Sequence, residues 1–142
     1  MQVFSVLGYL GLLPFIGLTL LSLFPYLLPS LDALALFQRY SAIILGFMAG
    51  VLWPIWQQHH ALKPLAIFAV SLAILSFLAG FFPNAVTIAI ELLLFIALRL
   101  GERWFGLDEA YPAAYLQLRR NLTRVVVLCH ATLLVSLAGW LA

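Results

Sequence analysis

Residues 40–56 read YSAIILGFMAGVLWPIW, an uncharged stretch that follows Arg39 and is long enough to form a membrane helix. Within it, Ala42, Gly46 and Gly50 recur at a spacing of four, so on a helix they share one face. Side chains this small let a neighbouring backbone approach closely, and such packing is a main source of helix association in lipid. The stretch therefore predicts the central helix of a transmembrane bundle, packed through these three small residues.

The composition of the whole chain also indicates a protein surrounded by lipid. Hydrophobic residues make up 65% of the 142 residues and charged residues 8%, against roughly 45–50% and about 25% in soluble domains. A soluble domain of this size cannot bury so much apolar surface, so we expect a single domain surrounded by the lipid bilayer. The few basic residues form no patch with stacking aromatics, which argues against binding to nucleic acid.

Five apolar segments are separated by loop signals of proline, glycine and polar residues. We expect an all-α membrane protein, a five-transmembrane-helix bundle that forms one domain over residues 1–142. Pro14 lies inside the first segment and predicts a kink there. The segment before the last helix is polar and aromatic, which is typical of an amphipathic stretch at the membrane interface. The expected helices cover residues 3–28, 40–56, 64–82, 85–100 and 122–141, and the interfacial segment covers residues 108–120.

A second pair of small residues, Ser76 and Gly80, lies four residues apart in the third expected helix. The spacing places both on one helix face, where it predicts close packing with a neighbouring helix. Asn84 and Asp108 come directly before helical segments, and their side chains are candidate N-caps for those segments.

The basic residues predict the orientation of the bundle. If the N-terminus is cytoplasmic, six basic residues lie on that side and only Arg39 lies on the other, as the positive-inside rule favours. The six are Lys63, Arg99, Arg103, Arg119, Arg120 and Arg124. We therefore expect a cytoplasmic N-terminus and a C-terminus on the opposite side.

Glu91 and His130 are the residues within the apolar segments that are best suited to carry chemistry. A carboxylate inside lipid is costly unless it is protonated, paired or in contact with water, so it marks a candidate functional site. The two residues are expected at similar depths on antiparallel helices, where a pair is sterically allowed, and Arg39 is the alternative ion-pair partner for Glu91. Such a pair fits a proton relay or a quinone-type ligand contact. The structural alternative, which we favour, is a hydrogen bond that fixes the helices together.

Arg119, Arg120 and Arg124 form a basic run at the start of the last expected helix. Their guanidinium groups predict contact with anionic phospholipid headgroups such as cardiolipin. The same charges are also explained by the positive-inside rule alone, and one surface can serve both purposes.

Other chemistry has little support in the sequence. His59 and His60 are adjacent in a loop with no cysteine or second histidine cluster nearby, so we expect no metal site. His130 is the only histidine in an apolar segment, so no pair of axial haem ligands is available. The sequence contains no nucleophile–base pair, HExxH motif or glycine-rich phosphate loop, so we expect neither an enzyme nor a cofactor.

Three stretches of the chain resemble an uncharacterised membrane family. Residues 40–53 are similar to its helix of tyrosine, small residues, phenylalanine, glycine and tryptophan, although Leu52 stands where the family often has histidine. Residues 115–123 (YLQLRRNLT) with 125–128 (VVVL) resemble its second signature, and residues 11–15 (GLLPF) resemble its Gly-x-x-Pro-Phe start. The family is a bacterial inner-membrane domain of unknown function that also includes mitochondrial transmembrane protein 69. The resemblance implies a multi-pass protein of the bacterial cell inner membrane, with a periplasmic C-terminus and no established activity.

Two functions fit these observations. The first is a small integral inner-membrane protein that acts as an accessory, stabilising or assembly subunit of a larger membrane complex. Because the resembled family occurs in bacteria and mitochondria, a respiratory-type complex is the leading partner by analogy. The alternative is a transporter or proton-conducting element centred on Glu91 and His130 and formed as a homo-oligomer. Transporters usually line a route with several polar residues, and this sequence offers few.

Overall fold

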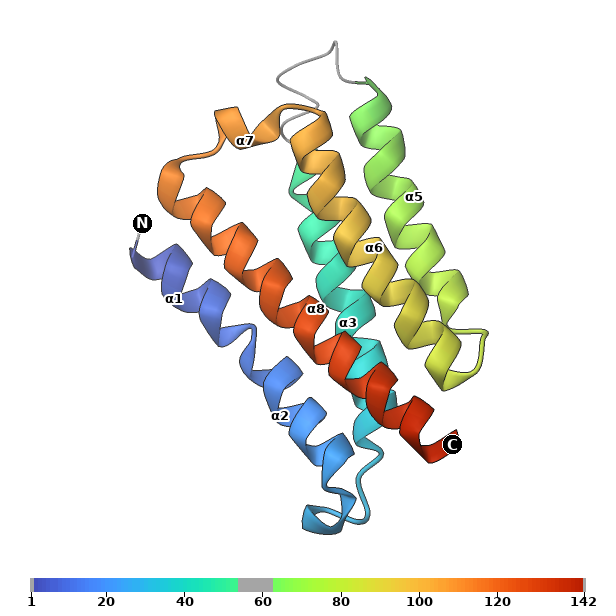
Figure 1. Cartoon of the computed structure of the whole chain (residues 1–142). Helices are drawn as coiled ribbons and strands as arrows, with labels where there is room; N and C mark the ends of the chain where they lie inside the picture. Colours follow the sequence, from blue (N-terminus) through green and yellow to red (C-terminus); the bar gives the residue numbers. More distant parts are fainter. Residues whose placement is uncertain (1, 54–62, 142) are drawn as a thin grey trace.

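The structure of the chain is a computed structural model, and it describes residues 2–53 and 63–141. The described part consists of helices, turns and loops and contains no strand. Figure 1 shows the elements in chain order, namely α1 (Gln2–Leu10), α2 (Leu13–Leu23), the 3-10 turn η1 (Pro25–Leu27), α3 (Ala33–Gly50), α5 (Lys63–Ala79), α6 (Asn84–Trp104), α7 (Leu107–Ala110) and α8 (Ala113–Leu141).

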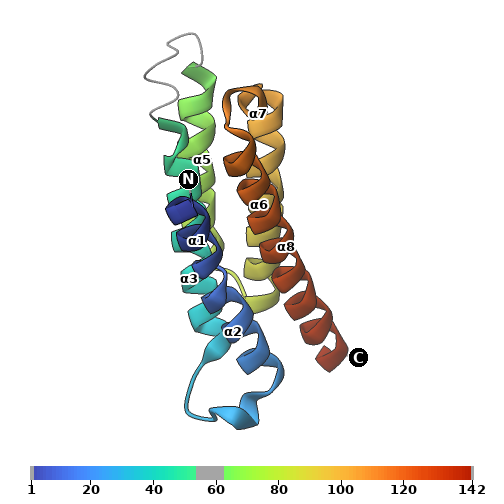
Figure 2. The ribbon, with the colours of Figure 1, turned by 90° about the vertical axis from the view of Figure 1, so that its left-hand side faces the viewer.

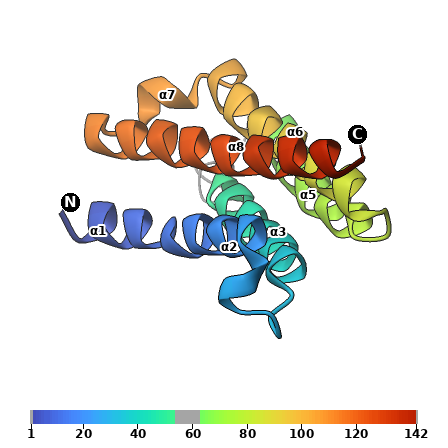
Figure 3. The same ribbon diagram turned by 60° about the horizontal axis from the view of Figure 1, so that its bottom comes forward.

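The long helices lie side by side in a bundle. α3 packs against α2, α5 and α6, while α8 packs against α6, α2 and α1. α1, α2, α5 and α8 run in one direction and α3 and α6 in the other, so the two chain ends lie toward opposite ends of the bundle (Figure 1). Figures 2 and 3 show α8 lying alongside α6, with α1 and α2 on a separate side of the bundle. The predicted all-α class is confirmed for the described residues.

Among the described residues, four helical segments are long and apolar enough to cross a membrane. They are Ser5–Leu23, Ala33–Gly50, Asn84–Trp104 and Ala113–Gly139. The fifth apolar helix, α5, has 17 residues and is shorter than these four. The chain thus carries the helices of a multi-pass membrane protein.

The first apolar segment is interrupted at residues 11–12, just before Pro14, where the sequence predicts a kink, and it ends at Leu23 instead of residue 28. α1 ends at Leu10, and α2 begins at Leu13 with Pro14 in its first turn. Proline lacks an N–H group, and the first turn of a helix needs none, so Pro14 fits the first turn of α2 directly after the interruption. α2 ends at Leu23, and Pro25 begins the separate turn η1.

α3 begins at Ala33, earlier than the predicted start at residue 40. Asp32 explains the earlier start, because its side chain accepts a hydrogen bond of 3.0 Å from the backbone N–H of Ala35. This contact satisfies one of the free N–H groups at the helix start. Residues 54–56 of the predicted helix lie outside the described residues.

The last two long helices also differ from the predicted bounds. α6 continues to Trp104, past the predicted end at residue 100. Asn84 is the first residue of α6 rather than its cap, and its side chain accepts a hydrogen bond of 3.1 Å from Gln38. α8 begins at Ala113, so most of the predicted interfacial segment is the first part of this continuous helix.

Two of the three positions on the small-residue face of α3 have no close neighbour. A Cβ atom added at Gly46 or Gly50 would meet no atom within 4 Å, and both positions are outside the core. The predicted internal packing through Ala42, Gly46 and Gly50 is therefore not formed at Gly46 and Gly50. The buried face of α3 is the neighbouring one, which carries Ala33, Phe37, Ser41, Leu45, Met48 and Ala49.

Close helix contacts occur at two other glycines. A Cβ atom added at Gly101 in α6 would overlap the ring of Phe68 in α5. One added at Gly8 in α1 would lie 2.8 Å from the Leu118 side chain in α8. Gly80 is exposed and meets only the backbone of its own helix, so the predicted packing pair with Ser76 is not formed.

Candidate functional site

Four polar side chains meet in the core of the bundle. Ser41 of α3 and His130 of α8 are 0% exposed, Glu91 of α6 is 1% exposed, and Ser76 of α5 is 4% exposed. We call these four residues the core cluster. Because each residue comes from a different helix, the core cluster connects four helices through one set of polar contacts.

Glu91 contacts a serine with each of its carboxyl oxygens. The Ser76 hydroxyl donates to Oε1 at 2.5 Å, and Ser41 Oγ lies 3.3 Å from Oε2. Ser41 Oγ also lies 2.9 Å from Nε2 of His130. The carboxyl group and the imidazole are thus connected through the hydroxyl of Ser41, not through direct contact.

The second ring nitrogen of His130 determines which tautomer is present. Nδ1 lies 2.7 Å from the backbone oxygen of Val126, and a carbonyl oxygen can only accept a hydrogen bond. Nδ1 therefore carries a hydrogen and donates it to Val126. In a neutral imidazole this leaves the lone pair of Nε2 facing Ser41.

Three phenylalanine rings surround the imidazole of His130. The centroid distances are 4.8 Å to Phe37, 5.4 Å to Phe95 and 6.1 Å to Phe15, and all three rings are buried. These rings exclude water from the imidazole and place the core cluster in a medium of low dielectric constant. Such surroundings stabilise neutral groups more than charged ones.

The structure brings Glu91 and His130 into one cluster, as their expected depths allow. Ser41 and Ser76, which complete the cluster, are not identifiable from sequence as its members, because serine in a membrane helix is equally compatible with close packing. Arg39 is exposed and forms no ion pair with Glu91 in the part of the chain that is described. The structure thus does not support Arg39 as the alternative partner.

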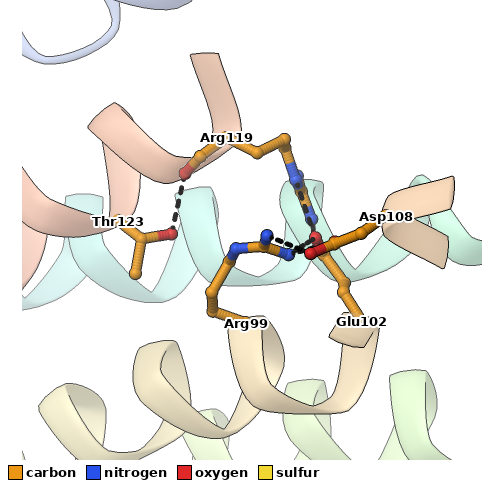
Figure 4. Close-up of polar contacts among 5 residues, drawn as sticks. All are labelled: Arg99, Glu102, Asp108, Arg119 and Thr123. Atoms are coloured by element: carbon orange, nitrogen blue, oxygen red, sulfur yellow. Dashed lines mark hydrogen bonds and ion pairs between the residues drawn. The ribbon is translucent and has the colours of Figure 1, made fainter. Parts of the chain in front are cut away.

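A second polar group lies at the end of the bundle where α6, α7 and α8 meet, and Figure 4 shows it in close-up. Arg99 makes two parallel hydrogen bonds to Asp108, each 2.7 Å long, and a third contact of 3.2 Å to Glu102. Arg119 pairs with the same Glu102 through Nε, at 3.3 Å, and through Nη2. We call these four residues the ionic cluster.

The position of Arg119 corrects its predicted role. Its side chain is buried, with 3% of the residue exposed, and it is paired with Glu102 instead of facing lipid headgroups. Arg120 and Arg124 are exposed, and they line a shallow pocket of about 300 Å³ together with Gln117 and Asn121. Only these two arginines of the basic run are therefore available to a ligand outside the chain.

Asp108 was predicted as a helix cap, but it forms the bidentate pair with Arg99 instead. The hydrogen bonds from Arg99 lower the pKa of Asp108 below its ordinary value, since they stabilise the ionised carboxylate. Glu102 was not singled out in the sequence, although its position three residues after Arg99 is a signal for an ion pair on one helix face.

Metal binding finds no support in the described residues. No group of three or more histidine, cysteine, aspartate or glutamate side chains among them could hold a metal ion. His59 and His60 lie outside the residues that the structure describes.

Comparison with known proteins gives a family and no activity. No curated protein and no solved structure matches the chain. A family model described as "Protein of unknown function (DUF3429)" matches residues 2–135, which is nearly the full length. The chain therefore belongs to the DUF3429 family, whose function is unknown.

Proposed function

We propose that this protein is an accessory, stabilising or assembly subunit of a larger complex in the bacterial inner membrane. The observation that carries the proposal is the small-residue face of α3, formed by Ala42, Gly46 and Gly50. Gly46 and Gly50 have open space beside them, although their spacing is typical of helix packing in membranes. The exposed side chains of Ile43 (67%) and Phe47 (72%) border this face and add apolar surface.

The occupant that fits this face is a transmembrane helix of a larger integral membrane protein. Lipid chains form few van der Waals contacts with a glycine surface, whereas a helix backbone can approach it closely and form many. The core cluster supports a structural role, because it is closed within the bundle and joins four helices. A respiratory-type complex is the leading candidate partner, by analogy only.

Five membrane spans are part of this proposal. At 1.5 Å per residue, the 17 residues of α5 extend about 26 Å, close to the hydrocarbon thickness of roughly 30 Å. With α5 as a span, the two chain ends lie on opposite sides of the membrane. The excess of basic residues then favours a cytoplasmic N-terminus and a periplasmic C-terminus.

The proposal also includes a contact between the protein and lipid headgroups, made by Arg120 and Arg124. Their exposed guanidinium groups, with the amides of Gln117 and Asn121, line a pocket near the start of α8. We infer that an anionic phospholipid headgroup contacts this pocket, because guanidinium groups pair well with phosphate.

The test is extraction of the full chain from native membranes in mild detergent, followed by mass spectrometry of the co-purifying proteins. The variant G46L/G50L fills the open face, and we expect it to lose the partner while it keeps its fold. Gly17→Leu is the matched control, because Gly17 is an open glycine on α2. Purification of the wild type without a reproducible partner, or equal recovery of the partner with G46L/G50L, contradicts the proposal.

A proton-conducting element, formed as a homo-oligomer, is the second candidate function. The observation that favours it is the run of hydrogen bonds from Ser76 through Glu91 and Ser41 to His130. Proton flux into liposomes that contain the purified protein tests it. Flux that Glu91→Gln abolishes supports conduction, and absence of flux in the wild type excludes it.

A further inference from the structure

The contacts of Ser41 limit where protons can reside in the core cluster. Ser41 has one hydroxyl hydrogen and lies between Nε2 of His130 and Oε2 of Glu91. One of these two atoms must accept the hydrogen of Ser41, and the other must donate a hydrogen to its oxygen. If His130 is neutral, Ser41 donates to Nε2, and Glu91 must be a protonated acid that donates through Oε2.

A second arrangement satisfies the same contacts. If Nε2 of His130 carries a hydrogen, it donates to Ser41, and Ser41 donates to an ionised Glu91. Both arrangements hold one shared proton, and both have zero net charge. If the site held no shared proton, one of the two contacts of Ser41 would lack a hydrogen. If it held two shared protons, it would carry a buried positive charge, which is costly in an apolar core.

The surroundings favour the neutral arrangement. The phenylalanine rings around His130 leave no water to solvate an imidazolium, and two separated charges in such a medium cost more than a neutral acid and base. Among the described residues, the ion pairs all lie within the ionic cluster, and none involves Glu91 or His130. Two uncharged titratable groups are sequence neighbours of the site. Cys129, next to His130, is buried, and Tyr40, next to Ser41, donates its hydroxyl to the backbone oxygen of Gly11.

We propose that Glu91, Ser41 and His130 form a buried proton-exchange site that holds one proton, with Glu91 protonated at rest and Ser41 as the relay. In the exchange, the Oε2–H bond of Glu91 breaks as its proton moves to Ser41 Oγ. The original O–H bond of Ser41 breaks as that hydrogen moves to Nε2 of His130. The products are a glutamate carboxylate and an imidazolium, and no proton enters or leaves the site. The 3.3 Å separation between Ser41 and Glu91 shortens during the first transfer.

This exchange is local, and it stands whether or not the protein docks on a partner or conducts protons across the membrane. Ser76 donates to Oε1 in both arrangements and therefore lies outside the transfer path. Failure of the partner experiment or of the flux experiment leaves the exchange site untouched.

The resting state is tested on the purified full chain in detergent. Infrared spectroscopy at neutral pH should show the C=O band of a protonated carboxyl group, and Glu91→Gln should lack it. Nitrogen NMR, with the His130 signals assigned by a His130→Phe variant, should show hydrogen on Nδ1 and none on Nε2. An ionised Glu91 at neutral pH overturns the proposal.

The relay is tested by raising the pH until Glu91 loses its proton. Ser41 must then turn its hydroxyl to the carboxylate, so the Nε2 signal of His130 should change at the same pH as the carboxyl band. We expect Ser41→Ala to abolish this coupling and Ser76→Ala to preserve it. Coupling that persists in Ser41→Ala, or that is absent from the wild type, overturns the relay. If Ser41→Ala does not fold, the wild-type titration alone still decides.

Discussion

The core cluster and the ionic cluster both place acidic and basic side chains inside the protein, but they keep these groups free of net charge in different ways. Each has no net charge, but the ionic cluster achieves this with two arginines and two acids in direct contact at one end of the bundle. The core cluster contains one acid and one base separated by a serine and surrounded by aromatic rings. Where fixed charges can pair directly, charges are retained, and where they cannot, a shared proton can make the groups neutral. This contrast predicts that neutralising an acid strongly destabilises the ionic cluster and has little effect on the stability of the core cluster.

The largest effect is expected when Glu102 becomes Gln. The change removes the charge that pairs with buried Arg119 and leaves this guanidinium without its main partner. Breaking a buried ion pair on one side costs about 3–5 kcal/mol, and we expect the free energy of unfolding to fall by that amount. Thermal or denaturant unfolding in detergent measures it.

The control for this prediction is the double variant Glu102→Gln with Arg119→Met. Removing both charges should recover much of the lost stability, because no unpaired charge is then buried. A double variant as unstable as the single one would show that packing, and not charge, explains the loss.

A smaller loss is expected when Ser41 becomes Ala. Its hydroxyl connects Glu91 to His130, so the change leaves a buried nitrogen and a buried carboxyl oxygen without their shared partner. An unsatisfied buried polar group costs about 1–3 kcal/mol. Ser71→Ala is the matched control, since Ser71 is exposed and bonds only to its own helix backbone at Ile67. Equal losses in both variants would argue against a central position of Ser41 in the core cluster.

The ionic cluster should also make the stability of the fold depend on pH. The pKa of Asp108 is lowered in the folded state by hydrogen bonds from Arg99, so ionised Asp108 stabilises the fold at neutral pH. This contribution is present above the unfolded pKa of about 3.9 and is lost as the pH falls through the lowered folded value. Asp108→Asn should remove this part of the acid dependence of the unfolding temperature. An unchanged acid profile in Asp108→Asn would assign the dependence to other carboxylates.

The smallest effect is expected when Glu91 becomes Gln. The amide resembles a protonated acid, because its oxygen can accept from Ser76 and its nitrogen can donate to Ser41. We expect the free energy of unfolding to change by less than about 1 kcal/mol, which is the net value of one ordinary hydrogen bond. The comparison is Glu102→Gln, measured in the same detergent. If the two glutamine variants are equally unstable, the core cluster depends on a fixed charge, as the ionic cluster does.

The sequence predicts much of the fold, because apolar length and proline position depend on local chemistry. It predicts all-helical structure and intramembrane positions for Glu91 and His130. It fails where the outcome depends on which helix face turns inward. Ser41 and Ala42 are adjacent and differ by about 100° around α3, and the face of Ser41 is the buried one. A pattern of small residues cannot distinguish a face that packs within the chain from one that is left open.

The ionic cluster could not be predicted for a related reason. Arg119 belongs to a basic run, and the positive-inside rule explains such a run without any partner. Its burial depends on the turn at Gly106, where φ is 74°, and on the short helix α7 that follows. Together they bring the start of α8 back alongside α6. Contacts between residues brought together by such a turn depend on its geometry, which residue spacing does not reveal.

α6 takes part in both clusters, and this has a mechanical consequence. Glu91 and Glu102 are eleven residues apart on the same helix. Polar contacts therefore hold α6 at two points that are about 16 Å apart along its axis. Sliding or rotation of α6 would separate both sets of contacts at once, so its register is fixed against α3 and α5 at Glu91 and against α8 at Glu102. A partner that approaches the open face of α3 would therefore meet a surface whose shape is set before the encounter.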